Sequence, residues 1–70
     1  MSWQIIEDHD TLTFSRFLPE SKLFIQIGHD HGPNASGIFE GTATDHENKI
    51  ITLATGSTFY EVFDKLRNVK

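Results

Sequence analysis

The hydrophobic residues of this 70-residue chain recur at two spacings, which predict a run of strands followed by one helix. Near the C-terminus, one apolar stripe repeats every three or four residues, formed by Phe59, Val62, Phe63, Leu66 and Val69. That spacing is typical of an amphipathic helix. Thr58 and Glu61 have the spacing of a capping box, with Ser57 as an alternative N-cap residue. We expect this stripe to be buried against a sheet, so that removing the Phe63 side chain would cost about 3–5 kcal/mol of stability.

Upstream of the helix, short segments alternate between apolar and polar residues or are rich in β-branched and aromatic ones, which predicts strands. The predicted strands cover residues 3–7, 11–18, 23–27, 38–44 and 49–54. Residues 28–37 contain three glycines and a proline, which predicts an irregular loop. Gly41 indicates a bulge or a close approach of another element.

Short connections favour the pairing of consecutive strands as antiparallel neighbours. The expected fold is therefore α+β, an antiparallel meander of four to five strands with one C-terminal helix packed on one face. A chain of this length forms one domain, residues 1–70.

The predicted strands carry apolar residues on both faces, although one helix covers only one. Phe24 faces away from its neighbour Ile25, and Ile38 faces away from Phe39. In the last strand, Ile51 and Leu53 are expected on the side opposite Ile50. The sheet could close into a partial barrel, pair with another copy or bind a different protein, or these residues could be scattered surface apolars. The candidate partner-binding residues are Phe24, Ile38 and Ile50.

Composition excludes several classes of protein. The chain has no cysteine, so disulfides and thiolate metal sites are excluded. Six Lys and Arg residues against ten Asp and Glu residues give a net charge of −4, which makes nucleic-acid binding an unfavourable interpretation. No apolar run approaches the roughly 20 residues of a membrane span. Residues 1–4 lack the features of a secretion signal, so we expect a cytoplasmic protein.

All four histidines lie beside acidic residues in predicted turns. In a meander, His9, His29 and His31 share one end of the sheet with the start of the helix, whereas His46 lies at the other end. These three are weak candidate ligands for Zn²⁺ or another divalent ion. Ordinary polar turns or a pH-responsive cluster explain the same residues. Their spacing matches no zinc signature, and no cofactor is expected.

The start of the helix, Gly56-Ser57-Thr58-Phe59-Tyr60-Glu61-Val62 with Leu66, resembles the ending of the small strand-rich domain of HicB-type antitoxins. The resemblance covers about a dozen residues and implies a glycine followed by a capped helix. The toxin-neutralising role of that family is not carried over to this chain.

No nucleophile motif is present, so we expect no enzyme activity. The favoured function is that of a small interaction protein that acts by protein–protein binding and self-associates. One alternative is an acidic inhibitor or decoy of a nucleic-acid-binding enzyme, of the kind encoded by phages or mobile elements. Another is a metal-binding module built from His and carboxylate side chains.

Overall fold

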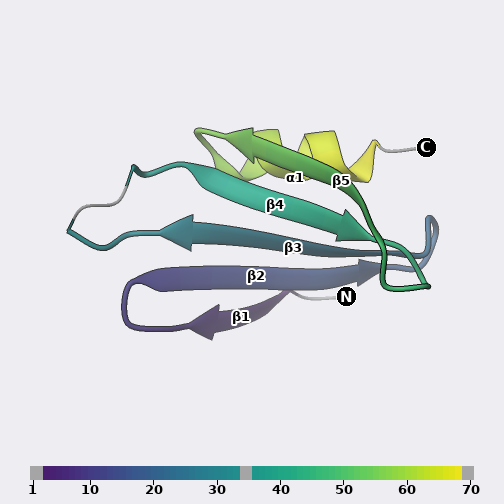
Figure 1. Ribbon diagram of the computed structural model, residues 1–70, viewed down its shortest axis with the longest axis horizontal. Helices are drawn as coiled ribbons and strands as arrows, with labels where there is room; N and C mark the ends of the chain where they lie inside the picture. Colours follow the sequence, from purple (N-terminus) through teal and green to yellow (C-terminus); the bar gives the residue numbers. More distant parts are fainter. Residues whose placement is uncertain (1–2, 34–35, 69–70) are drawn as a thin grey trace.

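The computed structural model describes residues 3–33 and 36–68, which form one antiparallel sheet and one helix (Figure 1). The elements are β1 (Gln4–Glu7), β2 (Thr11–Leu18), β3 (Leu23–Asp30), β4 (Phe39–Thr44), β5 (Ile50–Gly56) and α1 (Phe59–Arg67). The strands pair in the order β1-β2-β3-β4-β5, and each pair is antiparallel. The predicted α+β meander with its C-terminal helix is therefore confirmed.

Strand β3 continues through Gly28 and His29 to Asp30, so the prediction of a loop beginning at residue 28 was wrong. The reason is the central position of β3 in the sheet. His29 pairs with Leu12 on one side and with Phe39 on the other. Ladder hydrogen bonds to two neighbours thus override the turn-prone local composition, which describes only the isolated segment.

The helix packs over β3, β4 and β5, and its fully buried side chains are Val62 and Leu66. The apolar core contains Leu23, Ile25, Ile27, Ala43, Ala54, Val62 and Leu66. Gly41 lies directly beneath the helix, which confirms the predicted close approach at this residue. The register shift of the sheet lies instead between Ala43 and Thr44. Val69, the last residue of the predicted stripe, lies outside the described residues.

The start of α1 is held by two hydrogen bonds, of which the first is the one that the capping-box spacing predicts and the second goes to Ser57 instead of the N-cap residue Thr58. The Oγ1 atom of Thr58 accepts a hydrogen bond from the Glu61 backbone N–H at 3.2 Å. The Glu61 carboxylate in turn accepts one from the Ser57 backbone N–H at 3.0 Å. A Cβ atom at Gly56 would lie 2.9 Å from this carboxylate. A side chain at residue 56 would therefore displace the Glu61 carboxylate from this position, although the φ angle of Gly56 is not positive.

The connections β1–β2, β3–β4 and β5–α1 gather at one end of the sheet, at the left of Figure 1, and the other two lie at the opposite end. We call the end with the first three connections the helix-start end and the opposite end the far end. Within the described part of the chain, no helix is long and apolar enough to cross a membrane.

Candidate functional site

The sheet face opposite α1 is uncovered and carries exposed apolar side chains at its far end. Phe24 alternates with the buried Ile25 and is 37% exposed. It pairs with Phe17 on β2 and with Thr44 on β4. Thr44 in turn pairs with Ile50, which is 60% exposed. The structure therefore brings Phe24 and Ile50 to the same end of this face, on either side of Thr44.

Leu53 belongs to the same uncovered face, contrary to the sequence interpretation. It pairs with Thr42, which alternates with the buried Ala43, and it is 72% exposed. The register shift beside Thr44 is the physical reason, because a bulge breaks the simple alternation that placed Leu53 and Ile50 on opposite sides. We define the outer patch as Phe17, Phe24, Ile50 and Leu53.

Ile38 is not part of this patch. It lies just before β4, six residues from Thr44, which in an extended chain is roughly 20 Å. It borders a depression of about 290 Å³ at the helix-start end, together with polar residues such as Thr11, Asp30 and Glu40. The structure therefore separates Ile38 from the other two predicted partner-binding residues.

A second exposed apolar region, absent from the sequence predictions, lies on the helix-covered face. Helix α1 covers β3 to β5 but leaves β1 and β2 open on this side. The opening is a groove of about 570 Å³. Eight residues line what we call the aromatic groove: Trp3, Ile5, Phe14, Arg16, Phe39, Phe59, Tyr60 and Phe63.

The rings in the aromatic groove pack edge to face. The centroid of Trp3 lies 5.1 Å from that of Phe59 and 5.2 Å from that of Phe63, both at 80°. Phe14 approaches Phe59 at 5.1 Å and 71°. These are favourable aromatic geometries, so the floor of the groove is a connected set of half-buried rings from Trp3, just before β1, and from β2 and α1.

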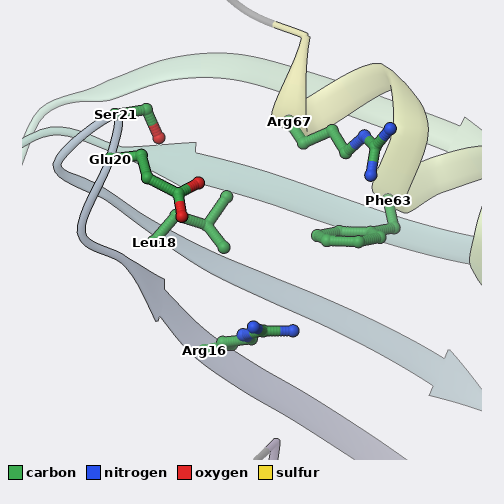
Figure 2. Close-up of a pocket in the computed structure, with 6 residues that line it drawn as sticks. All are labelled: Arg16, Leu18, Glu20, Ser21, Phe63 and Arg67. Atoms are coloured by element: carbon green, nitrogen blue, oxygen red, sulfur yellow. The ribbon is translucent and has the colours of Figure 1, made fainter. Parts of the chain in front are cut away.

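Two arginines border these rings. The Arg16 guanidinium carbon lies 5.7 Å above the Trp3 ring, and that of Arg67 lies 5.8 Å above Phe63. Figure 2 shows both arginines at a second pocket of about 440 Å³, which shares Arg16 and Phe63 with the aromatic groove. The Nε atom of Arg16 is buried and has no hydrogen-bond partner among residues 3–33 and 36–68. A guanidinium donor without an acceptor is costly in a buried position.

The groove could have been anticipated from dimensions alone. A helix is about 10 Å wide with its side chains, whereas five strands spaced about 4.8 Å apart span roughly twice that width. The apolar stripe of α1 was correctly assigned to the sheet, but one helix cannot cover all five strands. The aromatic residues over β1 and β2 therefore remain partly open.

The histidines share the predicted end of the sheet without forming a metal site in the described part of the chain. The His29 ring stacks on Phe39 at 4.2 Å and lies 6.3 Å from the His31 ring. His9 is exposed, with its Nε2 atom 4.0 Å from the Asp10 carboxylate. Within residues 3–33 and 36–68, no group of three or more His, Asp and Glu side chains is placed to hold a metal ion.

Among the described residues, two carboxyl groups have perturbed pKa values, and both belong to turns or caps. The backbone N–H of Ser57, its hydroxyl group and the Lys65 ammonium hold the pKa of Glu61 below its ordinary value. The backbone N–H of Lys49 is the main cause of the lowered pKa of Asp45. Neither carboxylate lines the aromatic groove, so these shifts reflect local structure rather than a catalytic site.

Comparison of the chain with protein-family models, curated protein sequences and solved structures finds no match in any of the three. The function is therefore argued from the outer patch and the aromatic groove.

Proposed function

We propose that this is a small non-enzymatic interaction protein that acts by protein–protein binding and self-associates through the outer patch. The observation that carries the proposal is the exposure of Phe24, Ile50 and Leu53 together on a sheet face that the helix does not cover. A sheet face that remains in water usually carries polar residues at alternate positions. Exposed apolar residues gathered on such a face are typical of an interaction surface.

The distribution of charge favours a second copy as the partner. Along the strands, the outer patch adjoins uncharged residues such as Ser15, Gln26 and Thr42, which lie opposite one another. The turns beside it at the far end carry charges of both signs, for example Lys22 and Asp45. Asp30 and Glu40, the charged strand residues on this face, lie toward the helix-start end. Two copies that overlap at their far ends and point in opposite directions would bury both patches and keep these carboxylates apart. Such a contact is self-complementary, as a twofold dimer requires.

The energetics are compatible with a weak, reversible dimer. Full burial of one large apolar side chain is worth about 1.5–3 kcal/mol, and a symmetric contact counts each patch residue twice. Association costs about 4–15 kcal/mol in lost freedom of the two bodies. The four patch residues are already partly buried, with 37% to 72% of each residue exposed, so a dimer gains only that fraction of the burial energy of each one. The gain is comparable to the cost of association, and we expect a weak, concentration-dependent equilibrium.

Sedimentation velocity over a concentration series tests this proposal. The wild-type chain should approach twice its monomer mass of 8.0 kDa, and Leu53→Asp should remain monomeric. Leu53 is 72% exposed, so this change should leave the fold intact. Tyr60→Asp is the matched control, because Tyr60 is 77% exposed on α1, away from the patch. A wild-type chain that stays monomeric throughout, or a Leu53→Asp variant that still dimerises, contradicts the proposal.

The acidic inhibitor or decoy remains the alternative function. Sedimentation velocity at low and high salt distinguishes it from self-association. Binding of a basic enzyme through surface carboxylates weakens as salt rises, because exposed charges are screened. The apolar contact proposed above should change little with salt. A cytoplasmic location, which fits a chain without cysteine, is part of either proposal.

A further inference from the structure

We propose that the aromatic groove is a second interaction site, which binds a peptide segment of another protein that carries large apolar side chains and a nearby carboxylate. The apolar side chains would lie on the rings of Trp3, Phe59 and Phe63, and the carboxylate would pair with Arg16 and Arg67. This site is independent of the outer patch, because it lies on the opposite face of the sheet.

The apolar part of the groove is open and large enough for more than one side chain. Its volume is about 570 Å³, and its rim is formed by Ile5, 60% exposed, and Tyr60, 77% exposed. The rings beneath are already ordered by their edge-to-face contacts, for example that of Trp3 with Phe59 at 5.1 Å. A ligand would therefore bury apolar surface without first ordering the floor, which lowers the cost of binding.

The charged part of the site follows from the two arginines. Within the described residues, no carboxylate lies within 4.0 Å of the Arg16 guanidinium, and its Nε–H is unpaired. Arg67 has one exposed partner, Asp64, at 3.4 Å. Figure 2 shows the Glu20 carboxylate beside Leu18, turned toward this pocket. A ligand carboxylate would form charge-assisted hydrogen bonds here, in competition with Glu20.

Other occupants fit less well. Nucleic acid needs several cations along its backbone, but the chain has a net charge of −4 and only two arginines border the groove. A second copy that docked its own aromatic groove here would bring the arginines of the two copies together, which like-charge repulsion disfavours. An apolar segment with an acidic residue satisfies both parts of the groove.

Selection from a display library of random short peptides, with the full chain as bait, tests the chemistry of the ligand. The expected result is enrichment of peptides with aromatic or large aliphatic residues and an Asp or Glu within one helical turn of them. Enrichment of basic peptides, or no enrichment over an unrelated bait, overturns the proposal.

The fluorescence of Trp3, the one tryptophan in the sequence, then measures the affinity of a selected peptide. Arg16→Gln should weaken binding about tenfold or more, which corresponds to the loss of one charge-assisted pair. The peptide affinity of Arg16→Lys should lie between those of wild type and Arg16→Gln, because lysine keeps the charge but lacks the planar guanidinium group. Glu20→Gln should strengthen binding. Lys49→Gln, in the turn between β4 and β5, removes the same charge elsewhere and should change nothing.

Each variant is first checked for a native thermal melt, and the comparison uses those that fold. Leu53→Asp should bind the peptide with wild-type affinity, because Leu53 lies in the outer patch. A failure of the peptide-binding proposal can therefore be distinguished from a failure of the self-association proposal. Equal peptide affinities of Arg16→Gln and wild type overturn the proposal. So does binding of a single-stranded oligonucleotide as tightly as the selected peptide.

Discussion

Gly41 on β4 lies directly beneath Leu66 on α1, with no room between them for a side chain. A Cβ atom at Gly41 would come within 2.6 Å of the Leu66 Cδ1 atom and 2.8 Å of the Val62 Cγ1 atom. Both partners are fully buried, so neither can move aside into solvent. The distance between the helix and the sheet is therefore set by the absence of a side chain at residue 41.

This relationship predicts that Gly41→Ala destabilises the protein by about 1–3 kcal/mol, because the added methyl group overpacks the core. Urea denaturation measures the difference. Gly28→Ala is the matched control on the neighbouring strand, since a Cβ atom there would meet no atom closer than 3.9 Å. Equal midpoints for the two variants would show that α1 can lift from the sheet without cost.

The helix stripe also predicts unequal costs for two truncations. Leu66 is fully buried, so Leu66→Ala should lose about 2–5 kcal/mol. Phe63 is only partly buried and forms a wall of the aromatic groove. We therefore expect Phe63→Ala to cost less than Leu66→Ala, below the 3–5 kcal/mol that its place in the stripe suggested. Thermal and urea denaturation of both variants measure the two losses of stability. A larger loss for Phe63→Ala than for Leu66→Ala would contradict the position of α1.

Phe63 and Leu66 illustrate what periodicity can and cannot predict. The 3.6-residue repeat identified the helix, and alternation located β2 at residues 11–18, because both patterns are local. The depth of burial depends on which strands lie beneath the helix, and no local pattern carries that information. The aromatic groove was missed for this reason.

Two sequence interpretations about the strands, the face of Leu53 and the end of β3, were wrong for the same cause. Phe24 and Ile50 came together because consecutive strands pair, which the connections predicted. Leu53 was assigned to the wrong face because the bulge beside Thr44 has no marker in the sequence. The continuation of β3 to Asp30 depends on neighbours that are distant in the chain.

Glu61 predicts a contribution of the helix cap to the pH dependence of stability. Hydrogen bonds from Ser57 and the charge of Lys65 lower its pKa in the folded protein below the ordinary 4.5. Because the pKa of Glu61 is lower in the folded state, its ionised carboxylate stabilises the fold at pH values above the unfolded-state pKa. This contribution is lost as the pH falls through the folded-state pKa. Wild-type stability should therefore decline as pH falls below about 4.5, more steeply than that of Glu61→Gln. Glu47→Gln, in a turn at the far end, is the control and should retain the wild-type slope.

Lys22 and Asn48 predict opposite outcomes for the same substitution. Both have left-handed backbones, with φ angles of 58° and 64°. Lysine tolerates this conformation poorly, whereas asparagine adopts it readily. Lys22→Gly should therefore raise the free energy of unfolding by up to about 1 kcal/mol, the relief of strain exceeding the added entropy of the unfolded chain.

Asn48→Gly should be neutral or slightly destabilising, because it removes little strain and still adds that entropy. The backbone N–H of Asn48 donates to the Asp45 carbonyl at 3.0 Å, and glycine keeps this bond. Urea midpoints of the two variants, compared with wild type, measure both changes. A loss of stability in Lys22→Gly would mean that the lysine side chain stabilises the β2–β3 turn by more than its backbone strain costs.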